Sequence, residues 1–121
     1  MGGWADQGVD PGLFSKQLCR DIGRLWGSGE GLSLKEILVK AVKENKFTGS
    51  STACLAKLDE KTDILESINL GDSGYRVFRK SDEGMKLVYA TVEQQHEFNF
   101  PYQCGTGGDD PRSAEDRKHH V

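Results

Sequence analysis

The sequence predicts an α+β fold in which two helices pack on an antiparallel β-meander. Two observations lead to this prediction. Residues 13–45 hold two segments whose apolar side chains recur every three or four positions, which is the period of an amphipathic helix. Residues 51–90 hold four shorter segments, separated by polar turns, that have the residue types and the alternation of β-strands.

The first helix has a clear start signal. Asp10 can accept a hydrogen bond from the first turn, and Pro11 suits the first helical position because an N–H there has no helical partner. The expected apolar stripe consists of Phe14, Leu18, Ile22, Leu25 and Trp26. The glycine-rich residues 27–31 are expected to end the helix.

The second helix is expected to begin at a capping box. Ser33 and Glu36 have the spacing in which each side chain binds the backbone N–H of the other residue. The expected apolar stripe consists of Leu34, Ile37, Leu38, Ala41 and Val42. Asn45 and Lys46 mark a plausible end before the chain enters the sheet.

The first two strands form the centre of the predicted sheet. In residues 51–59, one side carries Thr52, Cys54, Ala56 and Leu58, and the other carries Ala53, Leu55 and Lys57. Residues 64–70 resume the strand pattern after a polar turn at 60–63, so we expect an antiparallel hairpin. Gly71 and Gly74 then permit a tight reversal at residues 71–74.

Two further strands are expected at residues 75–79 and 85–90, around a turn at 81–84. Val77, Leu87 and Tyr89 are the residues expected to face inward. These strands complete a four-stranded meander in a domain that spans residues 1–104. Residues 105–121 are polar, glycine-rich and charged, which predicts a disordered tail.

One face of this sheet has no predicted cover. The helices can cover only one side, yet apolar residues lie on both sides of the first two strands. We therefore expect that the domain self-associates through the bare sheet face or that part of it is missing.

Composition limits the possible partners. A chain of 121 residues is one domain at most. Its 16 basic and 19 acidic side chains give a net charge of -3, which argues against nucleic acid and anionic membranes as partners. No apolar run approaches the length of a membrane span. Three widely spaced cysteines make neither a disulfide framework nor a zinc pattern.

The segment GDSG at residues 71–74 is the first candidate for chemistry. It matches the nucleophile segment of trypsin-like proteases, but the chain is too short for their two barrels, and His96 is the only mid-chain histidine that could serve as a base. A simple β-turn is the favoured interpretation. The Asp72 carboxylate could also help to bind Mg²⁺ or Mn²⁺, which prefer oxygen ligands.

The other candidates have ordinary structural interpretations. His96 is expected to be a surface or hydrogen-bonded histidine, with catalysis as the minority alternative. His119 and His120 would need a further ordered ligand to bind a metal. Cys54 is expected to be a buried strand residue. The two tryptophans, Trp4 and Trp26, are expected in the core or an interface.

Taken together, five blocks of the sequence resemble one family. They lie at residues 2–4, 8–15, 49–54, 69–74 and 93–101. In this order they are similar to the metal-dependent serine/threonine protein phosphatases of type 2C (PPM-type), in particular to the branch related to the mitochondrial PTC7-like phosphatases. The resemblance spans residues 2–103, and each block alone would be a weak signal.

This resemblance implies a fold, a cofactor and a reaction. The family fold is a four-layer α-β-β-α sandwich with two Mg²⁺ or Mn²⁺ ions between its sheets. The ions activate a water that hydrolyses phosphoserine or phosphothreonine, so the implied partner is a phosphoprotein. A mitochondrial location is the expectation that follows from the PTC7-like branch.

The family metal ligands carry over only in part. Its Ala-Asp-Gly segment would precede residue 1, and its Thr-Asp-Gly and Asp-Asp segments would follow residue 121, while Asp109 and Asp110 lack the matching strand context. Asp72 alone carries over, beside the dimetal centre, and Gly74 follows its serine where the wider family usually has arginine. We therefore expect a phosphatase fragment that is inactive alone; the alternative is a non-catalytic regulatory or binding module.

Overall fold

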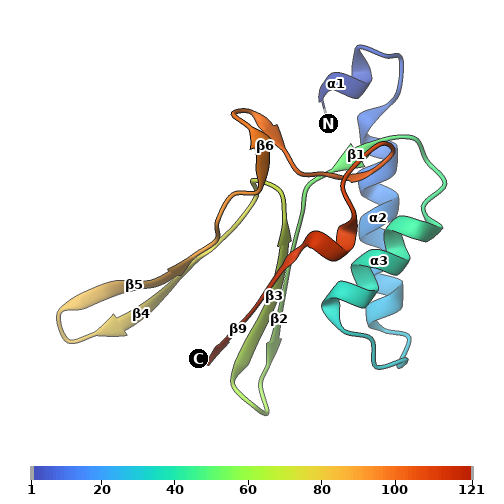
Figure 1. The fold of residues 1–121 in the computed structure, drawn as a ribbon. Helices are drawn as coiled ribbons and strands as arrows, with labels where there is room; N and C mark the ends of the chain where they lie inside the picture. The colour runs from blue at the N-terminus through green and yellow to red at the C-terminus, as the bar shows by residue number, and fades with distance from the viewer. Residues whose placement is uncertain (1, 121) are drawn as a thin grey trace.

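The computed structural model of the chain, which describes residues 2–120, has an α+β fold made of three parts. A helix pair covers one side of a central sheet, and a two-stranded ribbon extends from the other side (Figure 1). The helices are α1 (Gly2–Ala5), α2 (Pro11–Trp26) and α3 (Leu34–Glu44), with a short 3-10 helix η1 (Pro111–Ser113) near the C-terminus. Among the helices of residues 2–120, none combines the length and the apolar character needed to cross a membrane.

The caps predicted for α2 and α3 are confirmed. Asp10 Oδ1 accepts a hydrogen bond from Gly12 N at 2.9 Å, which satisfies one of the free donors of the first turn. The capping box of α3 is complete: Ser33 Oγ accepts from Glu36 N at 3.1 Å, and Glu36 Oε1 accepts from Ser33 N at 3.2 Å. Local sequence therefore fixes where both helices begin.

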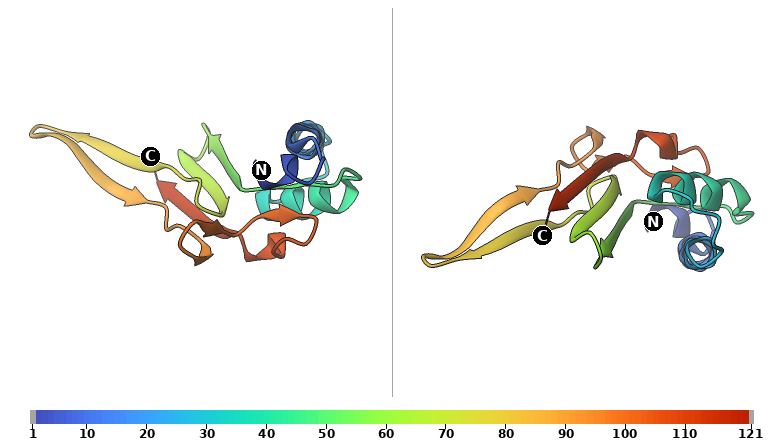
Figure 2. Two further views of the ribbon diagram at one scale, coloured as in Figure 1. Left: turned by 90° about the horizontal axis from the view of Figure 1, so that it is seen from above. Right: turned by 90° about the horizontal axis from the view of Figure 1, so that it is seen from below.

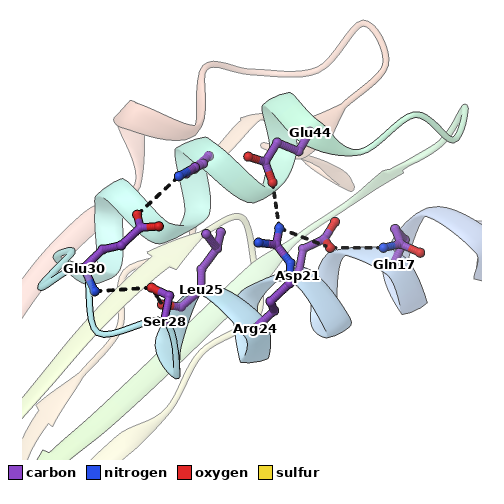
Figure 3. Close-up of polar contacts among 8 residues, drawn as sticks. Gln17, Asp21, Arg24, Leu25, Ser28, Glu30 and Glu44 are labelled. Atoms are coloured by element: carbon purple, nitrogen blue, oxygen red, sulfur yellow. Dashed lines mark hydrogen bonds and ion pairs between the residues drawn. The ribbon is translucent and has the colours of Figure 1, made fainter.

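Polar contacts tie α2 to α3 at the surface (Figure 3). Arg24 Nη2 donates to Glu44 Oε2 at 2.7 Å, which joins the two helices directly. Within α2, Gln17 Nε2 donates to the buried Asp21 Oδ1 at 3.1 Å. Exposed ion pairs of this kind add little stability, so apolar packing supplies most of the energy that holds the helices together.

The central sheet has three strands in the order β2-β3-β9. They are β2 (Ala53–Asp59), β3 (Ile64–Leu70) and β9 (Glu115–His120). Both neighbouring pairs are antiparallel, with Leu55 opposite Ile68 and Ile68 opposite Asp116. The hairpin predicted from residues 51–70 is confirmed.

The helix-facing side of this sheet forms the core. Ala53, Ile68 and Leu70 are buried there against the apolar stripes of α2 and α3. The core consists of Phe14, Leu18, Leu25, Leu34, Ile37, Leu38, Ala41, Ala53, Ile68, Leu70, Cys104 and Ala114. On the opposite side, Leu58 is 55% exposed, so apolar surface is left open there, as the sequence predicted.

The predicted four-stranded meander is wrong. Strands β4 (Arg76–Ser81) and β5 (Gly84–Ala90) pair only with each other and form a ribbon that extends away from the sheet (Figure 2). After β3, the backbone N–H and C=O of Gly71 bind Gln94 and not a residue of β4. The chain therefore leaves the sheet at Gly71. The edge of β3 that β4 would have occupied is taken by β9.

The predicted disordered tail also differs from the structure. Within residues 105–121, η1 and β9 are ordered elements, and β9 pairs with β3 from Asn69 opposite Glu115 to Ile64 opposite His120. Its side chains are charged, so the composition resembles that of a disordered segment. Backbone pairing with a neighbouring strand does not depend on that composition, and Lys118 Nζ lies 3.4 Å from Glu66 Oε1 across the pair.

Two short strand pairs connect these parts. Strand β1 (Ser50–Ser51) pairs with β8 (Cys104–Gly105), and β6 (Gln95–Glu97) pairs with β7 (Phe100–Pro101). They bring residues 94–110 against the start of β2.

Several apolar residues lie outside the core in which the sequence predicts them, namely Trp26 and the ribbon residues Val77, Leu87 and Tyr89. Trp26, the last residue of α2, is 50% exposed and packs under Lys57, whose Nζ lies 4.7 Å from the ring centroid. Leu87 is 48% exposed because the ribbon pairs with no other strand, and its neighbours Phe78 and Val88 are exposed as well; the register of the ribbon also shifts between Val77 and Phe78. The shift places Leu87 opposite Phe78 and turns it away from the face of Tyr89.

The three cysteines are expected to differ in reactivity. Burial raises the pKa of the Cys104 thiol from 9.0 to about 11, and burial also raises the pKa of Cys54, whereas Cys19 is exposed. Because the thiolate is the nucleophile, iodoacetamide at about pH 8 should modify Cys19 first and Cys104 last, at rates at least about tenfold apart. Peptide mass spectrometry measures the rates, and equal rates in the folded chain would contradict the burial of Cys104.

The same shift predicts a pH dependence of stability. Burial raises the pKa of the Cys104 thiol from 9.0, its value in the unfolded chain, to about 11 in the folded chain. Folding stability should therefore fall as the pH rises between these values, because the unfolded state releases its proton first.

Candidate functional site at the 71–74 turn

The turn at residues 71–74 follows directly from the end of β3. Leu70 is fully buried in the core, and Gly71 then turns the chain with φ +111°, a conformation that side chains rarely adopt. A Cβ on Gly71 would lie 2.5 Å from Thr52 Cγ2 and 2.7 Å from the carbonyl oxygen of Tyr102. The glycine is required here both for its backbone angle and for its lack of a side chain.

Hydrogen bonds from distant segments hold the turn. Gly71 N donates to Gln94 Oε1 at 3.0 Å, and Gln94 N donates to the Gly71 carbonyl at 2.9 Å. The hydroxyls of Ser73 and Thr52 lie 2.8 Å apart. The sequence does not assign Gln94 or Thr52 to this turn, because their contacts with it form only when the chain folds.

Asp72 lies exposed at the tip of this turn. It borders a pocket of about 540 Å³ together with Glu93, Arg76 and Phe78. Over residues 2–120, the structure records neither a hydrogen bond nor an ion pair of the Asp72 carboxylate. The turn is thus held by its neighbours, while its carboxylate stays available to a ligand.

The described residues do not fit a two-metal centre. Within residues 2–120, the structure has no group of three or more His, Cys, Asp or Glu side chains that could hold a metal ion. Glu93 is the second carboxylate beside Asp72, whereas Mg²⁺ needs about six oxygen ligands. Asp72 as a metal ligand therefore stays a prediction, and no metal-dependent step is assigned to these residues.

His96 is hydrogen-bonded, as predicted, and its partner is Asp109. His96 Nε2 lies 2.8 Å from Asp109 Oδ1, and the His96 ring stacks on Tyr102 with centroids 4.4 Å apart. Asp109 Oδ2 also accepts a hydrogen bond from Gln103 N at 3.0 Å. The Asp109 carboxylate therefore joins β6 to the loop that precedes η1. The sequence around Asp109 does not predict this structural role.

The remaining candidates have structural contacts. Asp110 caps η1 by accepting a hydrogen bond from Arg112 N at 2.9 Å. His119 Nε2 lies 3.0 Å from the Tyr75 hydroxyl, on the side of the sheet that faces the ribbon. Trp4 Nε1 donates to Ser50 Oγ at 2.7 Å and connects α1 to β1.

Asp109→Ala is expected to destabilise the chain by about 1–3 kcal/mol, because it leaves the partly buried Gln103 N–H without its acceptor. Asp72→Ala, in contrast, should change the free energy of unfolding by less than about 0.5 kcal/mol. Urea denaturation followed by circular dichroism measures both changes. If Asp72→Ala lowered the free energy of unfolding as much as Asp109→Ala, this description of the turn would be wrong.

Comparison with known proteins finds relatives that are named protein phosphatases. The chain is 43% identical over 110 residues to the protein phosphatase PTC7 homolog of Xenopus laevis, an alignment that covers 85% of this chain and 36% of the relative. It is 41% identical over 110 residues to the PTC7 homolog fig of Drosophila yakuba, covering 85% of this chain and 33% of the relative. It is 40% identical over 120 residues to the probable protein phosphatase 2C 80 of Arabidopsis thaliana, covering 95% and 28%.

The chain thus spans about a third of the length of the curated relatives it matches. No protein-family model matches the chain, and no solved structure matches it.

Proposed function

The chain is related to the PTC7-like protein phosphatases of type 2C over most of its length, and we propose that it forms one segment of a protein serine/threonine phosphatase. The substrate would be a phosphoprotein that loses phosphate from serine or threonine. The observation that carries this proposal is the identity to named phosphatases along almost the whole chain. The position of Asp72 on a rigid, exposed turn supports it.

The structure supports an arrangement in which further parts of such a protein cover this segment. Leu58, Phe78 and Met85 are exposed large apolar side chains on the open side of the sheet and on the ribbon. Asn69 Oδ1 is buried without a hydrogen-bond partner among residues 2–120, an arrangement that costs stability unless a donor reaches it. We propose that the second half of a four-layer α-β-β-α sandwich packs on this side.

Self-association of the isolated chain follows from the same bare surfaces. Without the covering part, the exposed apolar residues would favour association between copies of the chain. Sedimentation velocity of the purified chain tests this proposal. A sharply monomeric species over the whole concentration range would contradict it.

Mg²⁺ or Mn²⁺ dependence is the expectation for the whole protein. The described residues do not supply the set of metal ligands. We propose that most of the ligands lie in parts of the whole protein that correspond to the two thirds of the relatives outside the alignment. On its own the chain should show no phosphatase activity.

A chimaera tests the proposed function. Residues 2–120 of this chain would replace the corresponding segment of the Xenopus laevis PTC7 homolog, to which it is 43% identical. We expect Mn²⁺-dependent hydrolysis of a phosphoserine peptide by the chimaera, and a loss of at least about tenfold in the Asp72→Asn variant. Asp82→Asn changes an exposed aspartate in the ribbon turn and is the matched control.

The two outcomes separate the candidate functions. A folded but inactive chimaera would overturn the phosphatase proposal and favour the non-catalytic binding module. Activity that is unaffected by Asp72→Asn would retain the function and remove Asp72 from the site.

A mitochondrial location is proposed from the PTC7-like relationship alone. The test is fluorescence microscopy of the natural gene product carrying a C-terminal fluorescent tag. Exclusive staining of another compartment would contradict it.

A further inference from the structure

Gln94 contacts three separate segments of the chain, and the proposed function gives it no role. Its side-chain Oε1 accepts from Gly71 N at 3.0 Å, and its Nε2 donates to the Ser113 carbonyl at 3.0 Å. Its backbone N donates to the Gly71 carbonyl, and its own carbonyl accepts from Tyr102 N, each at 2.9 Å. All four hydrogen-bonding groups of this residue are therefore used.

We propose that Gln94 is a positioning residue that fixes the 71–74 turn, and with it Asp72, to the segment that precedes β9. This inference rests on the proposed function in one respect, the role of Asp72 in phosphatase activity. Its geometric part concerns three segments, around Gly71, Gln94 and Ser113, that are joined by one amide side chain.

The Gln94 amide suits this role because it has both an acceptor and a donor. The pairing of β3 with β2 and β9 ends at Leu70 and Asn69, so Gln94 takes the place of a strand partner and satisfies both backbone groups of Gly71. The turn has little room to shift in response, since Gly71 lies against Thr52 and the Tyr102 carbonyl. Gln94 therefore holds the turn and the Ser113 segment in a fixed relative position, through its side chain and its backbone N–H.

Neighbouring Gln95 provides a matched control. It is exposed, and its Nε2 donates to Glu93 Oε2 at 3.1 Å, a contact that joins no distant segments. A methionine substitution removes the same amide group at both positions. At Gln94 it breaks contacts with Gly71 and Ser113, and at Gln95 it breaks only the contact with Glu93.

Amide hydrogen exchange of the 121-residue chain, followed by NMR, tests the proposal without metal or substrate. In Gln94→Met, exchange at Gly71 should accelerate by about five- to tenfold, because its N–H loses the Gln94 acceptor. Exchange at Ala114, whose N–H belongs to the same peptide group as the Ser113 carbonyl, should also accelerate, because Gln94 no longer holds that peptide group in place. Exchange at Ile68, in the centre of the sheet, should stay unchanged. Gln95→Met should change none of these amides.

Gln94→Glu separates the two ends of the contact and guards against a poorly folded methionine variant. The carboxylate can still accept from Gly71 N but cannot donate to the Ser113 carbonyl. Gly71 should keep its protection, while exchange at Ala114 should accelerate because the peptide group between Ser113 and Ala114 is no longer held by Gln94. Unchanged exchange at Gly71 in Gln94→Met, or equal acceleration at Ile68, would overturn the proposal.

The same variants in the chimaera distinguish the two proposals. Gln94→Met should lower phosphatase activity about as much as Asp72→Asn, whereas Gln95→Met should not. An inactive chimaera would reject the phosphatase function and leave the exchange result for Gln94 standing. An active chimaera that tolerates Gln94→Met would reject the positioning role alone.

Discussion

Gly71→Ala is expected to destabilise the chain by at least about 3 kcal/mol. The new Cβ would meet a backbone oxygen, that of Tyr102, at 2.7 Å, and Thr52 Cγ2 at 2.5 Å. The backbone oxygen belongs to a residue whose N–H is bound to Gln94, so it cannot move away cheaply. Chemical denaturation followed by circular dichroism measures the loss.

Gly84→Ala is the matched control for this prediction. Gly84 has φ +113°, almost the same as Gly71, but a Cβ there would have no neighbour within 4 Å. It should therefore show only the cost of the backbone angle, about 1–3 kcal/mol, whatever the surroundings. Equal losses at the two positions would mean that the 71–74 turn is free to relax and does not hold Asp72 rigidly.

Phe14→Ala should cost about 3–5 kcal/mol, as expected for a large aromatic removed from a core. Phe14 is 2% exposed and packs against the backbone of β8: its Cζ lies 2.9 Å from the position a Cβ would have on Gly105. Its carbonyl also accepts from Asn45 Nδ2 at 3.0 Å, so α2, the end of α3 and the strand pair meet at this residue.

The control for Phe14 is Phe98, which is 95% exposed in the turn between β6 and β7. Phe98→Ala should change the urea midpoint very little, because an exposed ring has few contacts to lose. Should Phe14→Ala cost less than about 1 kcal/mol, the described core between α2 and β1 would be wrong.

Local signals explain the parts of the fold that the sequence predicted. The caps at Asp10 and Ser33 and the β2–β3 hairpin depend on residues within a few positions of one another, so their chemistry can be read directly. The bare face of the sheet was predictable for the same reason, because residue alternation along a strand shows both of its faces.

Pairing between distant segments explains the rest. Nothing local in the charged residues of β9 indicates that it pairs with β3, and nothing local in β4 and β5 shows that they leave the sheet and so expose Leu87. The reversal at 71–74 looked like a hairpin turn, yet the hydrogen-bond partner of Gly71 is Gln94. The two glycines of the turn indicate only that the chain reverses there. They do not show whether the backbone groups of Gly71 bind a following strand or Gln94.

The candidate site shows the same division. Asp72 could be named from the sequence because a turn aspartate and the family resemblance coincide there. Gln94, Thr52 and the His96–Asp109 pair could not, since each acts through a contact that only the folded chain creates. The signal that could have found Gln94 was its place in the resemblance block at residues 93–101, for which the sequence offered no chemical role.

We propose above that this chain is a phosphatase segment and that most metal ligands of the whole protein lie outside residues 2–120. Calorimetric titration of Mn²⁺ into the 121-residue chain and into the chimaera is the decisive test of this proposal. We predict saturable binding by the chimaera and none by the chain alone, because residues 2–120 bring no third ligand to Asp72 and Glu93. Saturable Mn²⁺ binding by the chain alone, abolished by Asp72→Asn, would contradict the account.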